Sequence, residues 1–384
     1  MPGRSFRVAR IAGIPVGISP WWLAIVALIT WSLGAGYYPG EVPGIAPAAS
    51  YGLGLASALL LFASILAHEF GHALVARRHG VVIEEIDLWL LGGVARMSGQ
   101  PQNPRDELDF ALAGPVVTAV IAAIFGALAL AHPTSAPAAL LAVIRYQAEV
   151  NVLILGFNLL PAFPLDGGRV ARALLWRRSG NIAAATDTAA GLGRAFGYVL
   201  IGGGVLMTFY GYLEGLWLAV IGVFLTAAAS AERIQQEVVS AFTGIHAEEL
   251  MSQPVICIPA DLTLTDAAEQ YFSRYRYTAF PVIDASGRAV GLLSISQLEH
   301  IPHRANAGTL VGNGADRDLA LMVDKHEDVA HLLERSAFAR VGRATVIDES
   351  RRPVGILSIT DVQRAITATR LRDTPSRPAR PAPH

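Results

Sequence analysis

Long apolar runs in the first ~230 residues restrict most strongly how this chain can fold. Most of them reach the ~18–20 residues that are needed to cross the hydrocarbon core of a bilayer. The mean hydropathy of the chain is +0.43, and only 16% of its residues are charged. These values indicate an integral membrane protein. Six spans are expected, at about residues 20–38, 51–76, 108–131, 140–160, 192–210 and 213–229.

Charged residues concentrate after about residue 230, so the chain divides into a membrane half and a soluble half. We predict a membrane α-helical domain over residues 1–235, followed by a soluble α/β region. Cys257 is the one cysteine of the chain, which excludes an intrachain disulfide and any zinc cluster built from thiolates. Its neighbours are apolar and strand-forming, so we expect Cys257 to be a small core residue.

The second apolar run carries the sequence His68-Glu69-Phe70-Gly71-His72. In a helix, side chains four residues apart lie on one face, which suits two nitrogen ligands of a tetrahedral zinc ion. Glu69 lies beside the first histidine and can accept a proton from the attacking water. Ionisable groups inside a span are unfavourable and as a rule functional. We therefore predict a zinc-hydrolase site in the membrane; the alternative is a chance motif whose histidines only pack between helices.

A third ligand has to come from another part of the chain, and the end of the fourth span offers Asp166. Two prolines and two glycines interrupt the helix between residues 158 and 169, just where this aspartate arrives. Broken backbone inside a membrane is tolerated only where protein or a wet cavity satisfies its polar groups. We expect Asp166 to complete a site that leaves one coordination position for water. The alternative is a helix-end aspartate paired with Arg169 or Arg172.

The basic residues of the first half predict how the chain is oriented. The arginines that flank the spans fall on one side of a six-span arrangement; they are Arg4, Arg7, Arg10, Arg77, Arg78, Arg105, Arg169, Arg172, Arg177, Arg178 and Arg233. The loops at 39–50, 132–139 and 211–213 contain no Lys or Arg. The positive-inside rule therefore places both termini in the cytoplasm of a multi-pass plasma-membrane protein. Arginines precede the first span as in a signal peptide, but no convincing cleavage site follows, so we predict an uncleaved first helix.

These motifs together resemble the site-2 protease family of intramembrane metalloproteases. The residues that carry the resemblance are His68 to His72 on one span and Asn158, Pro161 and Leu165-Asp166-Gly167 on a later one. Further parts of the family's pattern are similar to Ala113-Gly114-Pro115 and to the segment from Leu91 to Arg96. The likeness covers about residues 10–230.

The resemblance implies a zinc endopeptidase that cuts the transmembrane segments of membrane-anchored proteins, among them anti-sigma factors in bacteria. It implies that His68, His72 and Asp166 are the metal ligands and that Glu69 is the base. Asn158 would position the substrate or the developing oxyanion, although a buried asparagine can also simply tie helices together. The expected partners are the lipid bilayer and membrane proteins, and no nucleic acid.

Residues 81–98 are predicted to form a short membrane-associated β-hairpin between the second and third spans. A β-branched, partly alternating run is turned back there at Gly92-Gly93. The resembling family has such a sheet, whose open edge could hold an unwound substrate as an added strand beside Gly92 and Gly93. A peptidase needs this because a helical peptide bond is shielded by its own hydrogen bonds. The alternative is a connector that only covers helix ends.

The soluble half contains an internal repeat, in which Asp284 and Asp348 are equivalent and 64 residues apart. Each copy is predicted to form a strand, a turn, a second strand and a helix opened by a Ser/Thr cap. The repeat resembles a tandem pair of CBS modules at about 246–303 and 307–368. This implies face-to-face association, an adenine nucleotide as ligand and a homodimer as one arrangement. The tail at 372–384 is rich in Pro and Arg and is expected to be disordered.

The CBS family holds a ribose with a Gly-x-x-Ser/Thr-x-x-Asp element. The second copy matches it at Gly355, Ser358 and Asp361, with Thr360 beside them. In the first copy Gln297 replaces the aspartate, so at most one such site is intact. An aspartate at a helix start is equally well explained as a cap, so nucleotide binding and capping both stay open.

Two other functions are weighed against a protease. A transporter or channel gated by CBS modules should line a path across the bilayer with polar residues and often repeats its halves. The membrane half shows no such repeat, and its polar residues converge near one face. A catalytically silent scaffold for membrane helices does not explain why the His-Glu-x-x-His motif and Asp166 are intact.

Overall fold

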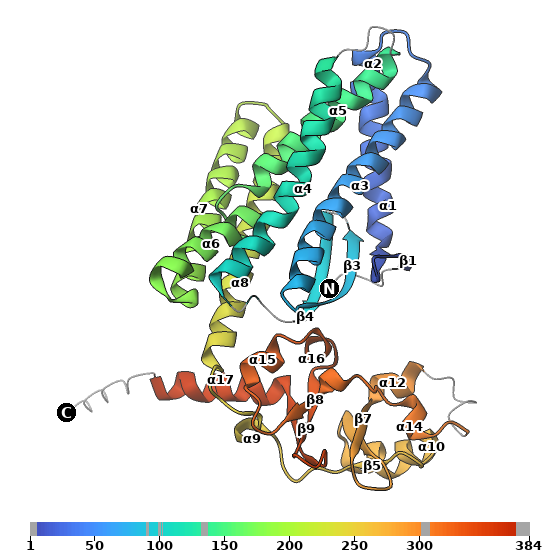
Figure 1. Ribbon diagram of the computed structural model, residues 1–384, viewed down its shortest axis with the longest axis vertical. Coiled ribbons are helices and arrows are strands. Elements are labelled where there is room, and N and C mark those ends of the chain that lie inside the picture. Colours follow the sequence, from blue (N-terminus) through green and yellow to red (C-terminus); the bar gives the residue numbers. More distant parts are fainter. Residues whose placement is uncertain are drawn as a thin grey trace, which may run out of the picture. The chain divides into compact units, whose positions relative to one another are not determined.

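The computed structural model describes residues 6–89, 92–98, 101, 103–131, 137–300 and 308–373. The chain forms two compact units, Met1–Glu237 and Val238–His384. Figure 1 shows the first as a bundle of long helices with a small sheet and the second as small sheets with short helices. Helix α17 continues to Asp373, and the rest of the tail that was predicted to be disordered lies outside the described residues.

Six helices of the first unit are long and apolar enough to cross a membrane, as the sequence predicted. The first combines α1 (Pro20–Ser32), a π-helical turn η1 (Leu33–Tyr37) and α2 (Tyr38–Glu41). The others are α3 (Pro47–Arg78), α4 (Pro104–Ala131), α5 (Ala138–Asn158), α7 (Ile182–Phe209) and α8 (Glu214–Ala241).

Large apolar side chains lie on the outside of these helices. Leu130 is 85% exposed, Phe209 84% and Leu213 77%. A soluble protein rarely exposes so many large apolar groups, whereas lipid covers them in a bilayer. The buried polar residues of the first unit are found inside the bundle instead, among them His68 and His72.

The segment after α5 forms a further helix that the sequence did not predict. Residues 159–165 make turns, and α6 (Asp166–Ser179) then runs to Gly180, whose φ of +69° ends the helix. A Cβ on Gly167 or Gly168 would come within 2.5 Å of backbone atoms of residues 159–163. These two glycines therefore let α6 begin directly against the preceding turns, which fixes the place of Asp166.

The predicted hairpin of β3 (Val82–Trp89) and β4 (Gly92–Ser98) is present and belongs to a larger sheet. Strand β2 (Ile14–Ile18) pairs with β3 in parallel and with β1 (Phe6–Ile11) in antiparallel fashion, which gives the order β1-β2-β3-β4. Strands β1 and β2 were not predicted from the sequence, in which this segment was interpreted only as the basic flank of the first helix. Ala12 and Gly13 both have positive φ, as a tight two-residue hairpin turn requires.

Helix α4 lies at the centre of the first unit, in contact with α3, α5 and α6 (Figure 1). It approaches α3 very closely, because a Cβ on Gly71 would lie 2.8 Å from the carbonyl oxygen of Ala113. Small residues at such a contact let two membrane helices pack backbone to backbone.

The second unit contains the predicted repeat as two three-stranded sheets. The first is β5 (Ile258–Pro259), β6 (Ala279–Ile283) and β7 (Ala289–Ser294), and the second is β8 (Met322–Asp324), β9 (Arg343–Ile347) and β10 (Pro353–Ser358). In each sheet an antiparallel hairpin carries a third, parallel strand, and a helix follows, α12 (Ile295–His300) or α17 (Ile359–Asp373). Shorter helices are α9 (Ala247–Leu250), α10 (Leu264–Ala267), η2 (Ala268–Phe272), α11 (Ser273–Tyr275), α14 (Val311–Gly314), η3 (Leu319–Leu321), α15 (Val329–Leu333) and α16 (Ser336–Val341).

The two hairpins turn in the same way. Asp284 accepts hydrogen bonds from the backbone N–H groups of Ser286 and Arg288, at 2.8 and 2.9 Å. Asp348 accepts the equivalent bonds from the residues two and four positions after it, at 2.9 and 2.8 Å. The repeat that was found by sequence offset is therefore a repeat of local structure.

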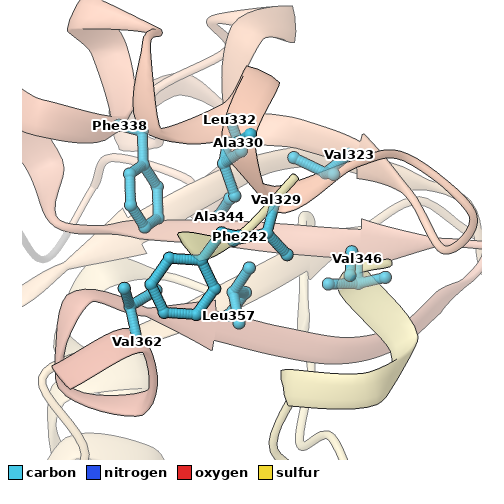
Figure 2. Packing of buried hydrophobic residues seen from close by; sticks show 11 residues of the cluster. Phe242, Val323, Val329, Ala330, Leu332, Phe338, Ala344, Val346, Leu357 and Val362 are labelled. Carbon is cyan, nitrogen blue, oxygen red and sulfur yellow. The ribbon is translucent and has the colours of Figure 1, made fainter. Parts of the chain in front are cut away.

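The segment that enters the second unit packs into the core of the second copy. Figure 2 shows the Phe242 ring beside Val362 and Leu357, and Phe242 is 2% exposed. The backbone N–H of Ala247 also donates to the carbonyl of Glu327 at 2.9 Å. Residues before and at the start of the first copy thus pack against the second one.

Phe242→Ala should lower the free energy of unfolding of the second unit by about 3–5 kcal/mol, because it removes a buried ring and leaves a cavity. Urea denaturation of a fragment of residues 238–373, followed by circular dichroism, measures the change. Leu319→Ala is the control, since Leu319 is 64% exposed and should contribute less than about 0.5 kcal/mol. Equal effects of the two substitutions would contradict this account of the core.

Candidate metal centre

His68 and His72 lie one turn apart on α3, and both are buried, with exposed fractions of 6% and 4%. Their Nε2 atoms are 3.1 Å apart and so face a common point. This is the arrangement expected from their spacing on a helix.

Asp166 is the first residue of α6, and its carboxylate meets both histidines. Its Oδ2 lies 3.1 Å from His68 Nε2, and its Oδ1 lies 3.3 Å from His72 Nε2. The alternative partners do not face it: Arg172 binds other carboxylates, and Arg169 lies over an aromatic ring. The structure therefore brings Asp166 to the histidine pair.

The three side chains fit a zinc ion. Nitrogen and oxygen ligands about 2.0–2.1 Å from a tetrahedral zinc lie about 3.3–3.4 Å from one another. The ligand atoms here are separated by 3.1, 3.1 and 3.3 Å. Two imidazoles and one carboxylate are also a donor set of catalytic zinc sites, which keep the fourth position for water or substrate.

Helix α4 supplies a hydrogen-bond partner for the Nδ1 atom of each histidine. His72 Nδ1 donates to the carbonyl oxygen of Phe110 at 2.8 Å, and His68 Nδ1 lies 2.8 Å from Thr118 Oγ1. A carbonyl oxygen can only accept, so His72 carries its proton on Nδ1 and its lone pair on Nε2. Such outer contacts orient metal-binding histidines and raise their basicity. The sequence analysis did not identify either partner.

Gly114 makes this approach of α4 sterically feasible. A Cβ at this position would lie 2.3 Å from His72 Nε2 and 2.6 Å from His68 Nε2. Any side chain here would collide with the two imidazole nitrogens. In the sequence Gly114 stands out only as part of a family resemblance, and the structure supplies the physical reason for a glycine there.

Glu69 lies between the metal centre and the sheet. A Cβ on Gly93 would come within 2.4 Å of Glu69 Cγ and 3.3 Å of its Oε1, so strand β4 runs directly against this side chain. Gly92, the neighbouring residue, has φ of +137°, a conformation that favours glycine. Of the two glycines that the sequence linked to substrate positioning, Gly93 lies against the predicted base and Gly92 lines the same cavity.

These residues line a cavity of about 440 Å³. One part of its wall is polar and includes Asn158, at the end of α5, and Thr118. The rest is apolar and aromatic, with Ile65, Ile154, Trp89, Phe157 and Phe224. The cavity thus combines a charged centre with walls that suit apolar side chains.

The residues proposed for a nucleotide lie at the start of α17 and cap it. Ser358 donates to Asp361 Oδ2 through its N–H at 3.0 Å and its hydroxyl at 2.6 Å, and Asp361 N–H donates back to Ser358 Oγ at 3.2 Å. Thr360 is exposed beside them. In the first copy, Gln297 accepts the equivalent bonds from Ser294 at 2.7 and 3.0 Å. The capping role, which the sequence left open, is therefore present in both copies.

Removing a ligand should abolish tight zinc binding, and removing an outer contact should weaken it. His72→Ala and Asp166→Ala should bind no zinc tightly, and Thr118→Val should bind it about 10- to 100-fold more weakly. Chelator competition on the purified protein gives the affinities. Thr186→Val is the control, since it removes another buried hydroxyl, on α7. Equal affinities of the two threonine variants would contradict the role of Thr118.

Two family models match the chain. The model of peptidase family M50 matches residues 56–135 and 126–201, which include His68, His72 and Asp166. The model of the CBS domain matches residues 247–301 and 320–368, which correspond to the two copies of the repeat.

Known proteins from three organisms are similar to this chain. Rip3 of Mycobacterium tuberculosis (strain ATCC 25618 / H37Rv), assigned as a zinc metalloprotease, is 37% identical over 372 residues, or 95% of this chain and 93% of Rip3. The protein sll0528 of Synechocystis sp., with the same assignment, is 33% identical over 78% of either chain. The solved site-2 protease from Methanocaldococcus jannaschii is 27% identical, with a TM-score of 0.42 over 60% of this chain and 95% of that one. The chain belongs to the site-2 protease family of intramembrane metalloproteases, peptidase family M50, and carries a tandem pair of CBS domains.

Proposed function

We propose that this protein is a zinc endopeptidase that hydrolyses peptide bonds in the transmembrane segments of membrane-anchored proteins. The observation that carries the proposal is the meeting of His68, His72 and Asp166 beside Glu69 in a cavity among membrane-crossing helices. A buried carboxylate next to three metal-binding side chains suits hydrolysis of a peptide. A site between such helices suits substrates that lie in the membrane.

Zinc, when bound by His68, His72 and Asp166, supplies a Lewis acid that polarises the scissile carbonyl and acidifies water. Glu69 accepts the proton of the attacking water and returns it to the leaving amine, so one water is consumed and one C–N bond breaks. Asn158 lines the same cavity, and we assign its side-chain amide to donate to the carbonyl oxygen of the substrate.

The substrate has to be extended at the point of cleavage, and β4 offers a partner for it. β4 is the last strand of its sheet, and at its start Gly93 lies against Glu69 while Gly92 lines the same cavity. A substrate segment that pairs with β4 as an added strand brings its backbone close to the base. Glycine at both positions leaves room for that approach.

Glu69→Gln should keep zinc but lower the rate of cleavage by about 10²- to 10⁴-fold, because the ligands remain and the proton acceptor is lost. The measurements are zinc content and cleavage of a membrane-anchored model substrate by the purified protein. Glu214→Gln, at the exposed start of α8, is the matched control. Cleavage by Glu69→Gln at the wild-type rate would contradict the role of Glu69.

The same variant can identify natural substrates. Cells that carry Glu69→Gln should accumulate membrane-anchored proteins that the wild-type protein removes. We expect regulators such as anti-sigma factors among them, because a cut inside the membrane releases a soluble domain.

We propose the plasma membrane as the location and the cytoplasm as the side of both termini, from the distribution of arginine. In a Cys257→Ser background, Tyr212→Cys in the α7–α8 turn should react with an impermeant thiol reagent added to intact cells. Ser179→Cys at the end of α6 should react only after lysis. The reverse pattern would overturn the orientation.

Burial raises the pKa of the Cys257 thiol to about 11, so this cysteine should label slowly at pH 7 even when it is present.

For the CBS pair, we propose an adenine nucleotide as a regulatory ligand. One candidate site is the start of α17, with Ser358, Thr360 and Asp361. The other is a cavity of about 600 Å³ at the equivalent end of the first copy, which includes Arg340 and Arg343. Both sites offer polar groups suited to ribose or phosphate.

Asp361→Ala should weaken nucleotide binding about tenfold if the nucleotide binds at the start of α17. Arg343→Ala should weaken it by a similar factor if the nucleotide binds in the cavity that includes Arg340 and Arg343. Titration calorimetry of the full-length protein with ATP, ADP and AMP decides between them. A melting curve controls for the loss of the α17 cap. No heat with any nucleotide at millimolar concentration would leave the pair as a module for dimerisation or substrate sorting.

A further inference from the structure

A buried ion cluster joins three helices of the first unit. Arg172 on α6 donates through Nε to Glu107 Oε1 on α4 at 2.5 Å, and its NH2 contacts the same oxygen. Its NH1 reaches Glu232 Oε1 on α8 at 3.3 Å. The side chains of Arg172 and Glu107 are only 3% and 1% exposed, whereas that of Glu232 is 28% exposed.

Helix packing alone does not require a buried ion cluster of this kind. Burying charges is unfavourable, and apolar residues of similar size often stabilise such a contact as well or better. Both bonds to Glu107 use one oxygen, and its Oε2 is buried with no hydrogen-bond partner among the described residues. What an ion pair adds is a defined geometry, because the planar guanidinium accepts few arrangements of its partners.

Arg172 stands on the same short helix as Asp166. Six residues separate them, or about 9 Å along the helix axis. The guanidinium of Arg172 also lies over the buried ring of Phe163, 5.1 Å from its centre, in the turns that lead into Asp166. Arg172 therefore stands on the helix that begins at Asp166 and contacts the turns that lead into it.

Glu107 stands on the helix that orients the histidines. Phe110, whose carbonyl binds His72, is three residues further along α4, and Thr118, which binds His68, follows on the same helix. The bond between Arg172 and Glu107 thus ties the helix that carries Asp166 to the helix that holds the other two ligands.

We propose that Arg172 is a positioning residue of the metal centre: through Glu107 it fixes the distance between Asp166 and the histidine pair. Glu232 makes that distance sensitive to α8, which runs on past the boundary between the two units at Glu237 and Val238. A shift of α8 along its axis would then reach Asp166 through this more exposed contact. The inference rests on the proposed zinc site. It connects the CBS pair to that site through the continuous helix α8 and the ion pair of Glu232 with Arg172.

The test measures metal binding of the purified full-length protein in detergent. Arg172→Gln and Glu107→Gln should each weaken zinc binding about 10- to 100-fold in chelator competition. The visible spectrum of the cobalt-substituted protein should change as well, because the carboxylate is displaced. The double variant Glu107→Gln/Arg172→Gln should recover most of the affinity, since two amides can bond to each other and no buried charge remains.

Asp187→Asn is the matched control, because it breaks an exposed ion pair with Arg233, at 2.9 Å, between α7 and α8. It should leave both readouts unchanged. Glu232→Gln provides a variant that should fold even if Arg172→Gln does not, because the contact is partly exposed. It should weaken zinc binding about 2- to 5-fold without lowering the melting temperature.

A purely structural role predicts a different result. The variants would then melt at lower temperature, but their folded fraction would bind zinc and cobalt as the wild type does, and that outcome overturns the inference. Wild-type zinc binding is the reference: if the wild-type protein binds no zinc, the proposed function itself fails.

Discussion

The packing of α4 on α3 is the contact on which the rest of the first unit depends. At Gly114 the two helices come so close that a Cβ on α4 would overlap the Nε2 atoms of His68 and His72. The same helix then fixes the ring of His72 through Phe110 and that of His68 through Thr118. Both bonds are buried, so they hold the imidazoles in one orientation, and the Phe110 carbonyl also fixes the tautomer of His72.

The other buried polar groups of the bundle follow the same rule. The Tyr38 hydroxyl bonds to Ser57 Oγ, and the Gln147 amide donates to the Ser57 carbonyl at 2.9 Å. These bonds connect α2, α3 and α5 away from the metal centre. Polar residues inside the membrane therefore serve two purposes here, which are to tie helices together and to build the site.

Local sequence patterns predicted the parts of the structure that depend on local geometry. The lengths of the apolar runs predicted the six long helices, and the helical spacing predicted that the two histidines lie on one face. Helix-breaking residues pointed to Asp166, and the 64-residue offset revealed the repeat. The partners of the histidines could not be found in this way, because one is a backbone carbonyl and the other a threonine, which is common in membrane helices. Strand β2 was missed because its pairing with β3 joins segments about 70 residues apart. Its hairpin partner β1 was missed because its arginines were interpreted as the basic flank of the first helix. Helix α6 was missed because turns separate it from the span before it.

The central claim is that His68, His72 and Asp166 hold one zinc ion. X-ray absorption at the zinc edge of the purified protein tests it most directly. The account predicts about four nitrogen and oxygen neighbours at about 2.0–2.1 Å, with the outer scattering of two imidazole rings. Asp166→Ala should lower the zinc content and change the inner shell of any zinc that remains. A shell of oxygen atoms alone, without imidazole scattering, would contradict the claim.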